Sequence, residues 1–361
     1  MARKLAFDRV LFATVLMLLG LGLVMVYSAS AAMVRARGLS FNPFFIKQCA
    51  AAAIGLVAMG ITMHIDYRIL RRPMVAYGIA GFAVALLVAV LFTPTLNNAR
   101  RWFFIGPVSV QPSELAKLVV ILFVAYQLER KADRVNSYAL LVPCAFLTAL
   151  MAALIYLGRD LGSTLLLVLP PFVMVFLAGI SGRFLALGAG MVLPLVAMAI
   201  ALEPYRFKRW MAFLNPEADP LGFGFQPLQS LIAIGSGGIF GLGPGASVQK
   251  LHFLPSPHAD FIFSIVAEEL GFVGAALVLG LFGLLLWRGL EAGMAAPDDF
   301  GRYLAYGLTI LIVSQALMHI SVALSLMPTT GVPLPLISHG GSSLVTTLTA
   351  CGLILNVSQH A

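Results

Sequence analysis

The chain has 361 residues, of which 60% are hydrophobic and only 11% are charged, and its formal net charge is +8. Apolar runs of membrane-spanning length recur from end to end, which excludes an ordinary soluble protein. In lipid the backbone must satisfy its own hydrogen bonds, and the alternating strands of a membrane barrel are absent, so the runs are predicted to be helices. The basic residues are scattered among the loops, so we expect no nucleic-acid partner.

The sequence predicts an all-α integral membrane protein with about ten transmembrane helices in a single polytopic domain that covers residues 1–361. The expected spans are 10–33, 44–63, 74–92, 113–129, 138–157, 161–179, 184–203, 261–287, 303–327 and 338–357. The first apolar stretch is too long for a cleaved signal peptide and is interpreted as a signal anchor. Pro170-Pro171 predicts a kink in the sixth span. The three cysteines lack metal-ligand spacing and are interpreted as packing residues.

An even number of helices places both termini on one side of the membrane. The 23 Lys and Arg residues divide almost evenly, with twelve on the side of the termini and eleven on the other. The flank of the first helix and the short loops 64–73 and 130–137 favour cytoplasmic termini. Basic residues kept on the outer side against the usual bias indicate an anionic ligand there.

Four loops rich in Gly, Pro, Asn, Gln and charge follow odd-numbered helices and therefore open on the outer face. They are 93–112, 158–160, 204–260 and 328–337. The third is a long extracytoplasmic loop between the seventh and eighth helices. Polar residues gathered on one face predict a built site, whereas the inner loops read as ordinary solvated turns.

Asp260 is a single carboxylate at the point where the long loop enters the eighth helix. It could be only an N-terminal cap, a common role for Asp. Its neighbours, His258 on one side and an apolar Phe-Ile-Phe run on the other, favour a catalytic role. His258 is interpreted as a hydrogen-bonding partner, and the lack of a second His or Cys at metal spacing argues against a zinc site.

Other charged residues of the outer face have simple alternatives as well. Arg100 and Arg101 could be interfacial anchors. Glu114 and Lys117 are three residues apart at the start of a helix and could form an ion pair that only holds that helix. Asp160 could form a surface pair with the arginine beside it.

The glycine-rich segment 235–245 invites comparison with a phosphate-binding loop. It lacks the Gly-Lys-Ser/Thr ending and a preceding strand, so a flexible loop or re-entrant helix is the preferred interpretation. Glu268 and Glu269 follow in the eighth helix, where charge is costly, and one of them is expected to face the interior of the bundle.

Several long motifs in one order resemble the SEDS family of bacterial cell-wall glycosyltransferases, whose members include FtsW, RodA and SpoVE. The resemblance covers nearly the whole chain and is carried by GLVMVYSAS, RRWFFIGPVSVQPSELAK, NPEADPLGFGFQPLQSLIAIGSGGIFGLG, QKLHFLPSPHADFIFSIVAEELGFVG and GVPLPLISHGGSSL. The fourth motif favours the FtsW branch over the RodA branch. Departures are Arg159 where the family often has Pro, Ser256 and Ala259 in the family's Glu-X-His-Thr-Asp pattern, and His339 where an aromatic residue is usual. These departures leave the acidic residue Asp260 in place but make the assignment to a subfamily less distinct.

The resemblance implies a peptidoglycan glycosyltransferase on the outer face of the bacterial cytoplasmic membrane, acting in cell division. It would polymerise lipid II and release undecaprenyl diphosphate. An acceptor hydroxyl needs a base, and one carboxylate suffices for an inverting displacement, so Asp260 is assigned as the base. The alternatives are an elongation-type RodA polymerase, a lipid II flippase or transporter, and a non-catalytic scaffold. A class B penicillin-binding protein transpeptidase is the implied partner, together with divisome or elongasome proteins.

The leaving diphosphate needs positive charge around it. We assign this role to Arg101 and Lys117, with Arg100 and Lys47 as further candidates. Glu114 and Asp160 would hold these cations or join a divalent ion; the sequence fixes no cofactor, although oxygen ligands would permit Mg²⁺ or Mn²⁺. Neutral hydrogen bonds to sugar or phosphate are assigned to Gln226, Gln229, Ser342 and Ser343. Loops 93–112 and 204–260 are expected to converge, which would bring Asp260 near Arg101 and Lys117.

Overall fold

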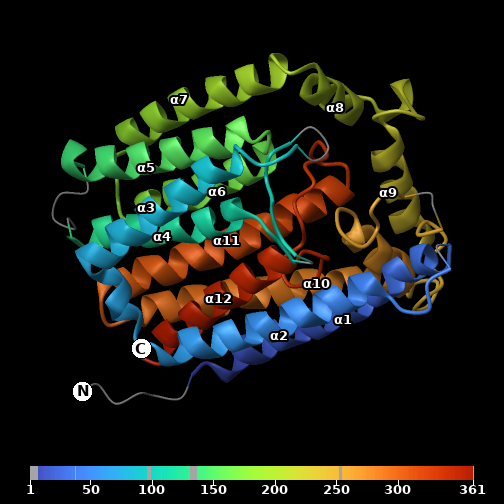
Figure 1. Ribbon diagram of the computed structural model, residues 1–361, viewed down its shortest axis with the longest axis horizontal. Coiled ribbons are helices and arrows are strands. Elements are labelled where there is room, and N and C mark those ends of the chain that lie inside the picture. The colour runs from blue at the N-terminus through green and yellow to red at the C-terminus, as the bar shows by residue number, and fades with distance from the viewer. Residues whose placement is uncertain are drawn as a thin grey trace.

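The computed structural model describes residues 7–36, 38–95, 99–106, 108–130, 136–251 and 254–360. These residues form a bundle of long helices with one two-stranded hairpin (Figure 1). A helix occupies each of the ten predicted spans: α1 (Arg9–Ala36), α2 (Pro43–His64), α3 (Pro73–Val90), α4 (Pro112–Arg130), α5 (Tyr138–Leu157), α6 (Leu161–Leu177), α7 (Gly182–Ala201), α10 (Ile262–Met294), α11 (Asp299–Ala323) and α12 (Gly341–Ser358). The predicted all-α membrane fold is confirmed.

Among the described residues, eight of these helices are long and apolar enough to cross a membrane. The other two are α6, which has only 17 residues, and α4, which carries charged residues in both its first and last turns. Fifteen of the 19 residues of α4 are buried, because this helix lies inside the bundle and presents little surface to lipid. The ten crossings stay a prediction, because they require that α4 and α6 also span the membrane.

The described ends of the chain meet at one end of the bundle. The backbone N–H of Asp8 donates a hydrogen bond to Ser358 Oγ over 3.2 Å, and the start of α1 lies near the end of α12 in Figure 1. From Ser358, α12 runs back through 18 residues to Gly341, a length of about 27 Å. Residues just before Gly341 therefore lie at the end of the bundle opposite the termini, as an even number of crossings requires.

The long segment 204–260 is not a plain loop, because it contains the helices α8 (Pro204–Leu214) and α9 (Phe225–Ser236) and a short 3₁₀ turn, Pro216–Ala218. Both helices are too short to be found as apolar spans. In α8, aromatic residues such as Tyr205 and Trp210 are exposed beside basic ones such as Arg206 and Arg209, which suits a helix at the membrane surface. Loop 93–112 likewise contains an antiparallel hairpin, β1 (Phe103–Ile105) and β2 (Val108–Val110).

The glycine-rich segment packs onto a break in α10 at Gly271, whose φ of 68° and ψ of −165° are non-helical. A side chain there would collide with the backbone, since a Cβ would lie 2.3 Å from the Gly241 nitrogen. Glu269 accepts a hydrogen bond from the Gly245 N–H (2.9 Å) and pairs with Lys250 (2.7 Å). Glu268 accepts from the backbone N–H groups of the adjacent residues 248 and 249. The segment is thus a loop held by the chain's own carboxylates, and both glutamates face the interior.

The helix α7 lies along the edge of the bundle, beyond α5 in Figure 1. None of its residues is buried within the protein, although it is apolar beyond Arg183 in its first turn. A helix of this composition is stable in such a position only where lipid covers it.

Candidate functional site

Asp260 lies at the end of a tight turn that leads into α10. The turn begins at Ser256, which has a φ of 51°, and the Ser256 carbonyl accepts hydrogen bonds from the N–H groups of Ala259 (3.0 Å) and Asp260 (3.2 Å). The N-cap of α10 is Phe261 rather than Asp260, so the Asp260 side chain does not cap this helix. Among the residues that the structure describes, none hydrogen-bonds to the Asp260 carboxylate.

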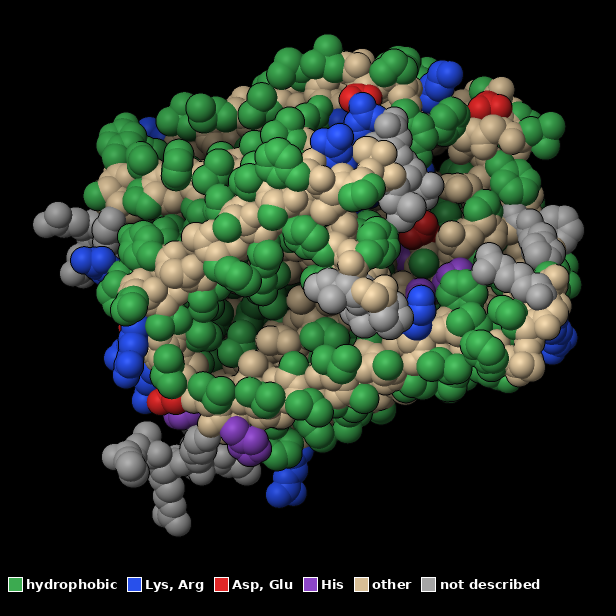
Figure 2. Space-filling model, viewed as in Figure 1, with side chains coloured by type: hydrophobic (Ala, Val, Ile, Leu, Met, Phe, Trp, Pro, Cys, Tyr) green, Lys and Arg blue, Asp and Glu red, His purple; other side chains and the backbone are tan. Residues whose placement is uncertain are grey.

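The charges of two guanidinium groups act on this carboxylate. Burial raises the pKa of Asp260, while the charges of Arg209 and Arg101 oppose that rise. Asp260 also faces loop 328–337, because a Cβ on Gly331 would lie 4.0 Å from its Oδ1, and Arg209 donates to the carbonyl of Thr329 in the same loop (2.8 Å). Figure 2 shows a hollow in one face of the molecule with acidic and histidine side chains at its floor. Segments 93–112, 204–260 and 328–337 therefore converge around Asp260, as predicted for the first two.

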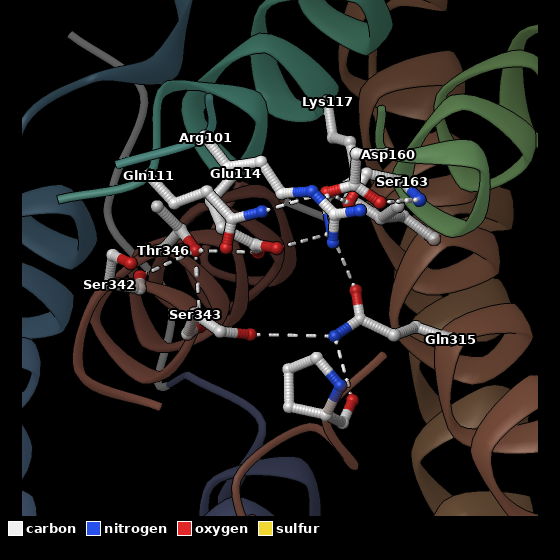
Figure 3. A network of polar contacts seen from close by, with 12 residues as sticks. Arg101, Gln111, Glu114, Lys117, Asp160, Ser163, Gln315, Ser342, Ser343 and Thr346 are labelled. Carbon is white, nitrogen blue, oxygen red and sulfur yellow. Dashed lines mark hydrogen bonds and ion pairs between the residues drawn. The ribbon is translucent and has the colours of Figure 1, made fainter. Parts of the chain in front are cut away.

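Arg101 is held beside the site by Asp160 (Figure 3). Its Nη1 lies 3.8 Å from Asp160 Oδ2, and its Nη2 donates to the carbonyl of Arg159. The same Asp160 caps α6 through the Ser163 N–H (3.0 Å) and accepts from Gln111 Nε2 (3.1 Å). Arg101 Nε is buried and has no hydrogen-bond partner among the described residues. Asp160 thus pairs with Arg101 and not with its neighbour in the chain.

Glu114 and Lys117 form an ion pair, which the sequence analysis gave as the simple alternative to a role in ligand binding. Their side chains are 4% and 2% exposed, and Lys117 Nζ lies 2.9 Å from Glu114 Oε1. Lys117 also donates to Gln315 Oε1 (2.8 Å), and Gln315 in turn donates toward Ser343 Oγ (3.4 Å). Figure 3 shows this network beside the Arg101 cluster, and a small cavity lies against it, lined partly by Glu114, Lys117, Gln315 and Thr346.

His258 is buried and packs against other rings. Its ring centroid lies 4.4 Å from that of Phe44 and 5.6 Å from that of His339. Burial and the nearby charge of Lys47 lower the pKa of His339 to about 4, so His339 is neutral at physiological pH. Lys47 itself is exposed on α2, which places it at the margin of the site.

The remaining predicted residues are less closely tied to Asp260. Arg100 donates to the Leu91 carbonyl at the end of α3 (2.8 Å), so it stabilises the loop and does not point to the carboxylate. Gln226 and Gln229 are half-buried on α9. Ser342 Oγ is buried without a hydrogen-bond partner among the described residues.

Sequence reasoning missed three polar residues of the site, Arg209, Gln315 and Gln111. A glutamine in the apolar span 303–327 was a detectable signal, because polar residues inside membrane helices usually have a partner. Arg209 is one of several basic residues in the long loop, and nothing local distinguishes it.

A polytopic membrane bundle with a charged site around Asp260 defines the class of this protein, and comparison with known proteins defines the family. The family profile FTSW_RODA_SPOVE, described as "Cell cycle protein", matches residues 8–361. The probable peptidoglycan glycosyltransferase FtsW of Trichlorobacter lovleyi is 40% identical, over 99% of this chain and 94% of the relative. Stage V sporulation protein E of Bacillus subtilis is also 40% identical, over 99% of each chain.

Two solved structures share the fold. One chain, from a structure that describes the coordination of polymerization and crosslinking by a peptidoglycan synthase complex, is 36% identical with a TM-score of 0.81, and the match covers 98% of both chains. The rod shape determining protein RodA of Thermus thermophilus is 34% identical with a TM-score of 0.71, over 98% of this chain and 97% of that one. This chain belongs to the FtsW/RodA/SpoVE family, which confirms the resemblance seen in the sequence.

Proposed function

We propose that this chain polymerises lipid II into glycan strands during cell division. The protein is a peptidoglycan glycosyltransferase of the FtsW type, as its 40% and 42% identity over almost its full length to two proteins of that name supports. The observation that carries the proposal is Asp260, a half-buried carboxylate without a hydrogen bond from the described residues, near the charges of Arg209 and Arg101.

In the proposed reaction, a hydroxyl oxygen of the acceptor sugar forms a bond to the anomeric carbon of the donor. The bond between that carbon and the diphosphate oxygen breaks, and its electron pair leaves with undecaprenyl diphosphate. The hydroxyl proton passes to the Asp260 carboxylate. Burial raises the pKa of this carboxylate and makes it a stronger base, and the charges of the two arginines limit that rise. A single carboxylate suits inversion, because retention requires a second one as nucleophile.

Arg101 and Arg209 are the cations best placed for the leaving diphosphate. Asp160 holds Arg101 from one side and leaves its Nε free of partners among the described residues, so the guanidinium is oriented before a ligand arrives. Preorganised charge of this kind stabilises a developing anion without reorganisation. Lys117 is buried and held by Glu114 and Gln315, and we assign it to the same site.

A divalent cation would enter this site together with the diphosphate. The described residues contain no group of three or more His, Cys, Asp or Glu that could hold an ion. Mg²⁺ or Mn²⁺ would therefore take most of its ligands from phosphate oxygens and water, as Mg²⁺ commonly does.

We further propose that the termini are cytoplasmic and that the site opens on the outer face of the cytoplasmic membrane. The location of the termini and Asp260 at opposite ends of α12 supports this arrangement. A class B penicillin-binding protein transpeptidase is the proposed partner, since a chain 36% identical to this one was solved in work on a synthase complex that polymerises and crosslinks peptidoglycan.

The test compares the purified wild-type protein with the Asp260→Asn variant, each with its transpeptidase partner and fluorescent lipid II, and separates glycan strands by gel electrophoresis. We expect strands from the wild type and a loss of at least about 100-fold in the variant at unchanged thermal stability. Polymer from both proteins at equal rates would refute Asp260 as the base. No polymer from either, with transfer of lipid II across vesicle membranes, would favour the flippase alternative.

A further inference from the structure

Two buried polar residues, Ser338 and Gln48, connect a transmembrane helix to the turn that carries Asp260. Ser338 precedes α12 and is 4% exposed, and Gln48 is a fully buried residue of α2. Among the described residues, neither side chain forms a hydrogen bond or ion pair with the proposed cations. Burying a polar group costs free energy unless it is hydrogen-bonded, and a fully hydrogen-bonded network makes the surrounding structure rigid.

The Ser338 hydroxyl makes both kinds of hydrogen bond. It accepts from the Leu334 N–H (2.8 Å) and donates to the Ala259 carbonyl (2.7 Å). That carbonyl and the Asp260 N–H belong to the same peptide group, so the hydroxyl fixes the peptide plane that leads into Asp260. Because peptide planes are rigid, the direction of the Asp260 side chain depends on this bond.

A second bond runs parallel to the first. The backbone N–H of His339 donates to the His258 carbonyl over 2.9 Å. Two consecutive carbonyls of the turn are thus attached to two consecutive residues before α12. The Asp260 carboxylate has no hydrogen bond of its own among the described residues, so these backbone bonds define its location.

Gln48 anchors the other side of this attachment. Its Nε2 donates to the Ser338 carbonyl (3.0 Å) and its Oε1 accepts from the Gly340 N–H (3.3 Å). Gln48 is held in turn by the close approach of α2 to α12: a Cβ on Gly55 of α2 would lie 2.5 Å from Leu348 Cδ1. The anchor is therefore part of the rigid bundle and not of a loop.

We propose that Ser338 and Gln48 are positioning residues for the catalytic base, acting through the backbone of residues 258–260. This inference rests on the proposed function, because it takes Asp260 as the base. A merely structural clasp would affect the amount of folded protein but not the properties of the Asp260 carboxyl in the folded fraction.

The test uses the full chain with its transpeptidase partner and fluorescent lipid II, and measures kcat, KM, thermal unfolding and the dependence of kcat on pH. Ser338→Ala removes the hydroxyl, and Ser338→Thr retains it. Ser30→Ala is the matched control, because Ser30 is also fully buried, donates to a carbonyl (Val26, 2.6 Å) and accepts from a side chain (Asn42, 2.7 Å).

For Ser338→Ala we expect kcat to fall about 10- to 100-fold at unchanged KM, since a displacement of about 1 Å costs on this order. The midpoint of the acidic limb of the pH profile should also move, because the carboxyl shifts relative to Arg209 and Arg101. Ser338→Thr and Ser30→Ala should keep the wild-type kcat and midpoint. A normal kcat in Ser338→Ala, or a lower kcat with an unmoved midpoint, would overturn the inference.

If Ser338→Ala does not fold, Gln48→Met takes its place in the test. It should show the same loss of kcat and a moved midpoint of the pH profile. A normal kcat, or a lower kcat with an unmoved midpoint, would count against the proposal. Failure of both variants to fold would also overturn it, since the residues would then be structural only. The Asp260→Asn variant separates the two levels. If it polymerises lipid II normally, the proposed mechanism fails, whereas an inactive Asp260→Asn beside a normal Ser338→Ala refutes the positioning role alone.

Discussion

Replacing Lys117 by Met tests whether its charge serves the fold, the reaction or both. Met retains the length of the side chain and removes the ammonium group that donates to Glu114 and Gln315. Both members of the ion pair are almost fully buried. Removing one partner of a buried pair leaves an uncompensated charge and costs about 3–5 kcal/mol.

This cost predicts a measurable loss of thermal stability. With an unfolding entropy of about 2 cal/mol/K per residue, it corresponds to a decrease in Tm of about 4–7 °C for a chain of this length. The double variant Glu114→Gln/Lys117→Met removes both charges and should recover most of the lost stability. An unchanged Tm in Lys117→Met would refute the argument from burial.

Polymerisation of lipid II then separates the roles. If the Lys117 charge acts on the diphosphate, both the single and the double variant lose activity, although the double variant is stable. Activity that returns together with stability in the double variant would show that Lys117 serves only the fold. The measurement is the rate of glycan synthesis at a temperature well below both Tm values.

Three further predictions follow from the charges around Asp260 and from the break in α10. Arg101→Lys should lose most of the polymerising activity at unchanged Tm, because the planar fork of Arg grips two phosphate oxygens and Lys does not; full activity would reduce Arg101 to an interfacial anchor. Arg209→Met should move the acidic limb of the kcat–pH profile to higher pH, because Arg209 opposes the rise in the pKa of Asp260 and its removal lets that pKa increase; a limb at the wild-type pH or lower would contradict this sign. Gly271→Ala should lower Tm by several degrees, because the φ of 68° and ψ of −165° cost a residue with a side chain about 1–3 kcal/mol before any collision. Gly280→Ala in the same helix, where a Cβ meets no atom within 4 Å, is the control and should not lower Tm.

The sequence predicted those parts of the structure that depend on local pattern. Each apolar run of spanning length became a helix, because the bilayer imposes both length and hydrogen bonding. The helices α8 and α9 were not predicted, since 11 and 12 residues at a surface leave no apolar run to detect. The ion pair between Glu114 and Lys117 could be proposed from the sequence, because the two residues lie one helical turn apart.

Contacts between distant residues could not be predicted in the same way. Ser338 bonds to Ala259 across 79 positions of the chain and Gln48 to Ser338 across 290, and no period or spacing records such pairs. Asp160 was assigned to hold a cation, but its additional role as the cap of α6 depends on the exact end of that helix. The sequence could therefore suggest candidate residues by type and by face, whereas bonds between residues far apart in the chain could not be predicted.

The lack of any protein-buried residue in α7 has a consequence for its sequence. Few of its side chains are confined by the bundle, so at its exposed positions the bilayer and not protein packing selects the apolar residue. Exchange of its lipid-facing Leu, Met and Val residues for one another should leave the fold intact, whereas equal changes in α4 would disturb packing on every side. Two parts of one bundle thus have different surroundings, α7 mainly lipid and α4 mainly protein.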